Sequence, residues 1–298
     1  MNPFKRVFVA IDFSPTSDEA LRQAHERALA TGALLAVCHI LPDSSRSNLF
    51  FPRLNRIASL NAPIETEKLA EAMMNRVADI TGRTGDDVTI ICDNGTAYEE
   101  ILRSAEEWKA DLIVIGSHGM TSATGILLGS VSRKIIRYAH ATVLIARPAA
   151  AGGEVIAATD FSDSATPALA VAIDEATRTK APLTLVHCID LEYASPSHGL
   201  MPFGGAMPTL SEEDYVSLRD DAKGRLLEVL KGFSGKGEAV VTVGHAASEL
   251  LGLAGSRNAS LLVMGTKGHT GIDRVLLGSV AETVAHDAPC SVMITRAH

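Results

Sequence analysis

The sequence contains few aromatic residues, few cysteines and no long apolar run. Aromatic side chains make up 4% of the 298 residues, so a folded core must be built mainly from aliphatic side chains. The four cysteines are too sparse for a disulfide framework and form no C-x-x-C pair, which favours reduced thiols. No window approaches the roughly 18 consecutive apolar residues of a transmembrane helix, and no signal-peptide pattern is visible. We therefore expect a cytoplasmic protein with no membrane partner.

Basic residues are outnumbered by acidic ones. The chain has 27 Lys and Arg against 35 Asp and Glu, a net charge of −8, which argues against nucleic acid as a partner. The excess lies mainly in the second half, where residues 150–298 carry 11 basic and 18 acidic side chains. With 46% hydrophobic and 21% charged residues, the composition is typical of a folded globular protein.

Several catalytic and binding signatures are missing. The sequence has neither a G-x-x-x-x-G-K-[ST] loop nor a G-x-G-x-x-G fingerprint, so P-loop and dinucleotide-binding interpretations lose support. No G-x-S-x-G surrounds Ser14 or Ser162, and neither is expected to be a nucleophile. His, Cys and Asp show no metal-ligand spacing. We predict no catalytic residue and no structural metal, and we expect His39 and His187, in apolar strands, to be core histidines with satisfied hydrogen bonds.

The chain contains an internal duplication. The segment Val7–Ser14 returns as Val155–Ser162 with an offset of 148, and Leu127–Val131 returns unchanged as Leu276–Val280. A repeat this long indicates two similar domains rather than a solenoid. The sequence predicts domains at 1–148 and 153–298, joined by a linker of small residues.

Apolar runs and helix-period patterns alternate in each half. In the first half, strands are predicted at Val7–Ile11, Leu34–Ile40, Val88–Cys92, Leu112–Ile115 and Thr142–Ala146. Helices are predicted at Ser17–Ala30, Ile64–Ile80, Thr96–Trp108 and Ser130–Ala139, with a capping box at Thr96-x-x-Glu99. The polar, proline-containing segment from Pro42 to Pro63 is not expected to be regular throughout. In the second half, strands are predicted near 155–159, 183–188, 239–243, 261–264 and 291–295.

This alternation predicts an α/β fold. Apolar strands separated by helices form parallel sheets covered on both faces, and right-handed crossovers make each sheet open and doubly wound. Ligands of such sheets bind beyond the carboxyl ends of the strands. The residues expected at that edge are Asp12, Ile40, Asp93 and Gly116 in the first half, and Asp160, Cys188, Gly244 and Gly265 in the second.

A spaced glycine motif follows the fourth predicted strand of each half. The first copy is Gly116-Ser117-His118-Gly119 followed, after nine residues, by Gly129-Ser130; the second is Gly265-Thr266-Lys267-Gly268 followed by Gly278-Ser279. Glycine lets backbone N–H groups approach an anion closely, and a helix N-terminus adds unpaired donors and the positive end of a dipole. Both segments are therefore candidate polyphosphate cradles.

The doubled G-x-x-G-x9-G-[ST] pattern is similar to the signature of the universal stress protein family, in its ATP-binding branch. The Asp-Phe-Ser sequence after the first strand, the histidine of the second strand and the segment 110–116 strengthen the resemblance, which covers nearly the whole chain as two tandem domains. It implies five-stranded parallel sheets of order 3-2-1-4-5, paired through their last strands. The chain would then be a monomer with an internal pseudo-dimer, or a homodimer.

The resemblance also implies that ATP, accompanied by Mg or Mn, binds across the ends of strands one and four. The residues implied on the adenine and ribose side are Ala10, Asp12, Ile40, Ala158, Asp160 and Cys188. Those implied on the phosphate side are Gly116, Ser117, His118, Gly119, Gly129, Ser130 and Val131, then Gly265, Thr266, Lys267, Gly268, Gly278, Ser279 and Val280.

Structural interpretations of the same residues remain open. Asp12 and Asp160 could cap turns, and Ser279, three residues before Glu282, could cap its own helix. The charges around the two cradles also differ. Arg133 in the first half is replaced by Glu282 in the second, whereas Lys267 and Arg274 of the second half replace His118 and Gly125 of the first.

The sequence thus predicts an ATP-binding regulator or sensor of the stress response, with unknown protein partners and at most slow hydrolysis. One alternative is an interaction module without nucleotide, in which segment 191–210 contacts an apolar ligand or a protein. An adenylyl transferase is a further alternative, but it would need an H-x-G-H type motif, which Ser-His-Gly-Met at 117–120 does not supply.

Overall fold

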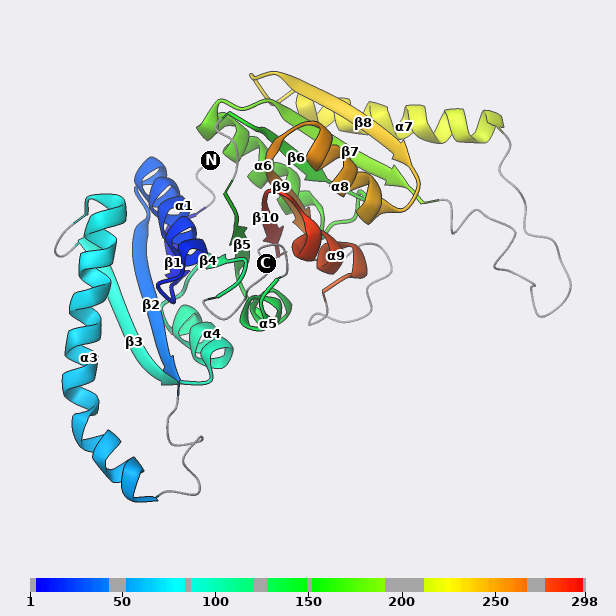
Figure 1. The fold of residues 1–298 in the computed structure, drawn as a ribbon. Helices are drawn as coiled ribbons and strands as arrows, with labels where there is room; N and C mark the ends of the chain where they lie inside the picture. Colours follow the sequence, from blue (N-terminus) through cyan, green and yellow to red (C-terminus); the bar gives the residue numbers. More distant parts are fainter. Residues whose placement is uncertain are drawn as a thin grey trace, which may run out of the picture. The chain divides into compact units, whose positions relative to one another are not determined.

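The computed structural model describes residues 4–42, 52–83, 87–119, 128–148, 152–190, 212–266 and 277–296. The chain divides into two compact units, Met1–Pro148 and Ala149–His298. Each unit alternates strands and helices along the chain (Figure 1). The α/β class expected from the sequence is confirmed in both.

The elements of the first unit are β1 (Arg6–Ala10), α1 (Pro15–Thr31), β2 (Leu34–Pro42), α3 (Pro52–Thr81), β3 (Val88–Gly95), α4 (Ala97–Glu107), β4 (Leu112–Gly116), α5 (Ser130–Tyr138) and β5 (Thr142–Ala146). Those of the second are β6 (Glu154–Ala158), α6 (Thr166–Thr179), β7 (Leu183–Ile189), α7 (Glu212–Leu230), β8 (Gly237–Val243), α8 (Ala246–Ser256), β9 (Ala259–Gly265), α9 (Ser279–Asp287) and β10 (Ser291–Thr295).

Within each unit every neighbouring pair of strands is parallel. β1 lies between β2 and β4, β3 extends the sheet beyond β2, and β5 extends it beyond β4. The second unit repeats the pattern, with β6 between β7 and β9, β8 beyond β7 and β10 beyond β9. In each unit this is the order that the resemblance implied. It brings the carboxyl ends of the first and fourth strands together at one edge, where ligands of doubly wound sheets bind.

Helices cover both faces of each sheet. In the first unit α1 packs against α3, and α4 packs against α5. The strands between them are buried on both sides, so β4 and β5 read as continuous apolar runs, and Leu112, Ile113 and Leu144 have no exposed surface. The core is therefore aliphatic, as the scarcity of aromatic residues predicted.

Helix α1 shows how local sequence sets the helix bounds. Ser14 is its N-cap, with a side-chain oxygen that accepts a hydrogen bond from Ser17 N at 3.2 Å. Pro15 occupies the first turn, where its missing N–H costs nothing. Gly32 ends the helix in the left-handed conformation, with φ 69°.

Two local predictions were wrong. Helix α3 begins at Pro52, twelve residues before the predicted start at Ile64. Pro52 occupies the first helical position, where a proline is tolerated, whereas Pro63 lies inside the helix, a place that the local sequence does not favour. The capping box at Thr96 is also wrong in part, because Thr96 is the N-cap of α4 but its side chain makes no capping hydrogen bond.

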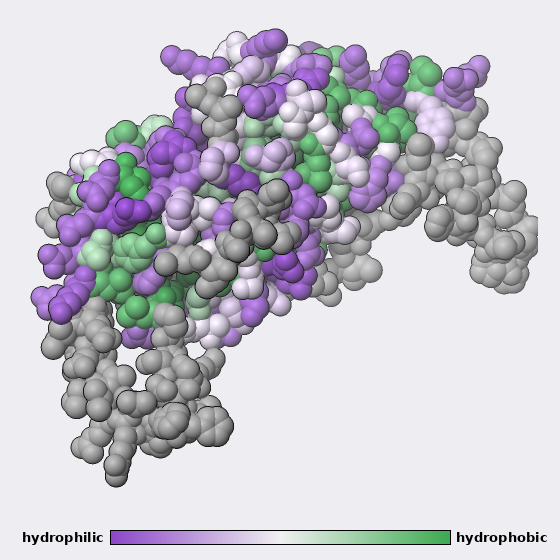
Figure 2. Space-filling view, in the orientation of Figure 1, coloured by the Kyte–Doolittle hydropathy of each residue, from purple (hydrophilic) through white to green (hydrophobic). Residues whose placement is uncertain are grey.

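Helix α7 lies largely on the surface of the second unit. It buries Ala222 and Leu226, while Val216 and Leu227 are each 48% exposed. Figure 2 accordingly shows hydrophobic residues beside hydrophilic ones over the region that Figure 1 labels α7. The preceding segment, 191–211, lies outside the described residues.

Candidate functional site

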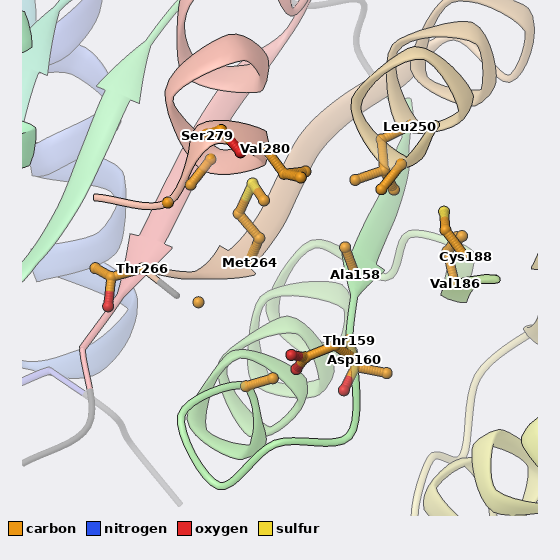
Figure 3. Close-up of a pocket in the computed structure, with 15 residues that line it drawn as sticks. Ala158, Thr159, Asp160, Val186, Cys188, Leu250, Met264, Thr266, Ser279 and Val280 are labelled. Carbon is orange, nitrogen blue, oxygen red and sulfur yellow. The ribbon is translucent and has the colours of Figure 1, made fainter. Parts of the chain in front are cut away.

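A pocket lies at the carboxyl ends of the strands in the second unit. Its lining comes from β6, β7 and β9, from helices α8 and α9, and from Ala165, the N-cap of α6 (Figure 3). Its volume is about 200 Å³, well above the roughly 10–15 Å³ that a cavity needs to hold one water molecule. The pocket is therefore large enough for a small organic ligand. Its lining residues are Ala158, Thr159, Asp160, Ala165, Val186, Cys188, Ala246, Leu250, Met264, Gly265, Thr266, Gly278, Ser279, Val280 and Ala281.

One end of this pocket is apolar. Val186 and Cys188 come from β7, Leu250 from α8 and Met264 from β9. The Cys188 thiol accepts a hydrogen bond from Thr242 Oγ1 at 3.1 Å, and burial raises its pKa. The thiol is thus neutral near pH 7. A flat, weakly polar group such as a nucleobase fits this chemistry, because sulfur and aliphatic groups make favourable contacts with aromatic rings.

Asp160 lies at the next part of the wall, directly after β6. Its Oδ1 accepts hydrogen bonds from Ser162 N at 3.1 Å and from Ser162 Oγ at 2.6 Å. These bonds close an Asx turn around Phe161, which has a left-handed φ of 64°. Asp160 therefore does cap a turn, as one interpretation held, and its carboxylate also lines the pocket.

The other end of the pocket is formed by the first turn of α9. Gly278 is the N-cap and makes no side-chain capping bond, while its N–H donates to Thr266 O at 2.8 Å. Ser279, Val280 and Ala281 line the pocket, and the first N–H groups of a helix have no partner within the helix. This end suits an anion. Because Ser279 is the first helical residue rather than the N-cap, the capping-box interpretation of Ser279 was wrong.

The first unit brings its predicted residues together by direct contacts. Asp12 Oδ1 accepts from Ser14 N at 3.1 Å, forming the same Asx turn. Thr16 Oγ1 donates to His118 O, and this bond ties the turn to the loop after β4. Gly129 N donates to Ser117 O at 2.8 Å, as Gly278 N does to Thr266 O.

The remaining predicted residues of the first unit lie on the strands and helix beside these contacts. Ala10 ends β1, where it pairs with Cys38 of β2, and Ile40 is buried two residues further along β2. Ser130 and Val131 open α5 and are exposed. Arg133, in the same turn, is exposed as well.

The glycines of the motif have different structural roles. A Cβ added at Gly265 would lie 2.8 Å from Ser164 O, and one at Gly116 would lie 3.0 Å from Thr16 O. These glycines allow the end of the fourth strand of each unit to pack closely against the chain where α1 or α6 begins. Gly119 leaves room for the Asp12 carboxylate, because a Cβ there would lie 2.5 Å from Oδ2.

The glycine before the last helix also serves close packing rather than an unusual backbone conformation. A Cβ added at Gly129 would lie 3.3 Å from His118 Cα. The φ angles of Gly129 and Gly278 are −63° and −68°, so no left-handed conformation requires glycine there.

Both strand histidines are hydrogen-bonded, as expected, but they are half-buried rather than in the core. His39 Nδ1 is hydrogen-bonded to Ile11 O at 2.7 Å, and His187 Nδ1 to Thr159 O at 2.9 Å. Each ring also contacts the phenylalanine of the adjacent Asx turn, with centroid distances of 5.2 Å for Phe13 and 4.5 Å for Phe161.

Sequence reasoning missed much of the apolar wall. Ala246 and Leu250 come from α8, which lies outside the glycine motif in the sequence. Val186 and Met264 lie two residues and one residue before the predicted Cys188 and Gly265. The period-2 alternation of β7 could have indicated Val186 from Cys188. Lys267, Gly268 and Arg274, predicted near the second cradle, lie outside the described residues.

Fold and pocket together define an α/β protein with a pocket at the carboxyl ends of a parallel sheet. The model of the universal stress protein family matches residues 3–147 and 153–296. The chain therefore belongs to this family, with two family domains in tandem.

Several known proteins are similar to this chain. A universal stress protein of Mycolicibacterium smegmatis is 26% identical over 300 residues, covering 97% of this chain and 96% of its own. The crystal structure of a universal stress protein from Archaeoglobus fulgidus has a TM-score of 0.66 at 17% identity and covers 98% of both chains. A universal stress protein in complex with cAMP matches 49% of this chain and 98% of its own, with 26% identity and a TM-score of 0.35.

The described part of the chain lacks two features. No helix in it is both long and apolar enough to cross a membrane. In the same residues, no three His, Cys, Asp or Glu side chains are grouped so that they could hold a metal ion.

Proposed function

We propose that this protein is an ATP-binding regulator or sensor of the stress response, and that ATP binds at the carboxyl edge of each sheet. The observation that carries the proposal is the pocket of the second unit. It joins an apolar end, an acidic turn and an uncapped helix N-terminus in one continuous wall. These three features match the three parts of a nucleotide. The apolar end suits the base, the acidic turn suits the sugar hydroxyls, and the helix N-terminus suits the phosphates.

Under this proposal, each part of the pocket would bind a different part of ATP. The base would lie against Cys188, Leu250 and Met264, where it loses contact with water. The ribose hydroxyls would donate to the Asp160 carboxylate. The phosphates would accept hydrogen bonds from the N–H groups that open α9, with the Ser279 hydroxyl beside them. Mg or Mn would arrive with the triphosphate and be held by its oxygens.

The test uses calorimetry of the full chain with MgATP, alongside mass spectrometry of nucleotide released from the purified protein. We expect a saturable heat of binding that Gly278→Val weakens at the second site, because its side chain would occupy the space at the opening of α9. Circular dichroism establishes that the variant is folded. Absence of any binding to the folded wild-type chain would contradict the proposal and favour an interaction module without nucleotide.

A further inference from the structure

The two units differ in what one equivalent arginine contacts. Arg76 on α3 and Arg225 on α7 occupy corresponding positions of the duplicated sequence. Arg76 pairs with Asp18 in the first turn of α1, with its Nε 2.8 Å from Asp18 Oδ1. The residue corresponding to Asp18 in the second unit is Thr166, which carries no charge. There the guanidinium of Arg225 lies over the Phe161 ring, 3.8 Å from its centroid.

Phe161 lies in the turn that follows Asp160, a residue that lines the pocket. Phe161 is the central residue of the turn closed by Asp160 and Ser162. Its φ of 64° is unfavourable for a residue with a side chain, and such a conformation persists only where surrounding contacts hold it. Those contacts include the His187 ring, Thr159 Oγ1, which accepts from Phe161 N at 2.9 Å, and the Arg225 guanidinium.

We propose that Arg225 is a positioning residue for the ligand site of the second unit. By packing over the Phe161 ring it adds to the contacts that hold the turn in the form that presents the Asp160 carboxylate to the pocket. The inference rests on the proposed nucleotide site. It means that ligand affinity in the second unit depends on a residue of α7. The first unit has no such dependence on α3, because Arg76 pairs with Asp18 instead. The two sites of one chain are thereby tuned separately.

The experiment measures the second site alone. Cys188 lines the pocket of that unit, so bound nucleotide should shield its thiol from a maleimide. Labelling of the full chain is followed by mass spectrometry of the Cys188 peptide at increasing MgATP, and the half-protecting concentration reports the affinity. A cation–π contact at an exposed site supports a change of about two- to fivefold. We expect Arg225→Gln to raise the half-protecting concentration by about that factor, and Arg225→Lys, which keeps a cation, to change it less.

Two controls separate positioning from other roles. Arg76→Gln removes the equivalent arginine of the first unit and should leave the protection of Cys188 unchanged. In a Phe161→Leu background, Arg225→Gln should have no further effect if Arg225 acts through the ring. A direct attraction of Arg225 for phosphate would survive in that background and would overturn the proposal. So would an unchanged half-protecting concentration in Arg225→Gln. A wild-type chain that ATP does not protect would instead contradict the nucleotide site itself.

Discussion

At the scale of single residues, Cys188 is the most direct chemical reporter of the pocket. Its side chain lies in the apolar wall, and burial raises the pKa of its thiol above the ordinary value. Thiol reagents attack the thiolate, so a raised pKa slows the reaction near neutral pH. Cys38 and Cys290 are buried, and burial raises the pKa of Cys38 to about 12. Labelling at Cys188 is therefore readily separated from labelling at these two core thiols.

We predict that the labelling rate of Cys188 rises with pH and reaches half its maximum above the range of an unperturbed thiol, which is about 8.5. The rate is measured at each pH by quenching the labelling reaction at set times and determining the labelled fraction of Cys188 by mass spectrometry. Thr242→Val removes a hydrogen bond that favours the thiolate and should move the midpoint further upward. A midpoint at or below the ordinary value would contradict the buried position of the thiol.

At the scale of elements, the end of β9 packs so closely against the turn before α6 that a glycine is required at position 265. We predict that Gly265→Ala destabilises the second unit by about 1–3 kcal/mol, because the new methyl would meet the Ser164 carbonyl oxygen. Urea unfolding monitored by circular dichroism measures the loss. The matched control is Gly252→Ala on α8, where nothing lies within 4 Å of the added methyl. That change should stabilise the protein by about 0.5–1 kcal/mol, and an equal loss in both variants would show that the turn does not matter.

Elements differ in how well the sequence predicts them. Strands such as β5 were predicted with the right bounds, because a short apolar run bounded by turn residues has one stable location in a doubly wound sheet. The start of α3 could not be predicted in the same way, because propensity alone does not distinguish a proline that breaks a helix from one that opens it. The left-handed conformation of Phe161 and its contact with Arg225 could not be predicted either, because both depend on packing between segments far apart in the chain.

The site shows the same division between local and long-range information. The glycine motif pointed to Gly278, Ser279 and Thr266, because their spacing follows from a strand, a loop and a helix in sequence order. The apolar wall could not be read from that motif. Leu250 reaches the pocket from α8 only because β9 brings the chain back beside β6.

At the scale of the whole molecule, two copies of the cradle predict more than one nucleotide per chain. Both units have the Asx turn, the N-cap glycine and the hydrogen bond from that glycine to the preceding loop. We predict a stoichiometry near two MgATP per chain by calorimetry. Gly129→Val and Gly278→Val should each reduce it to about one. A wild-type value of one would show that one of the two cradles no longer binds.

The packing of Gly116 and Gly265 against the neighbouring turn has an evolutionary consequence. Selection for folding alone would retain these two glycines, because any side chain there meets backbone atoms. A descendant that no longer bound a ligand would keep glycine at the first position of the motif. Its sequence could change at positions that are constrained only by ligand binding. In duplicated proteins of this kind, the first glycine therefore reports the fold alone. The residues after the N-cap glycine, such as Ser130 and Ser279, are expected to report whether a domain still binds a ligand.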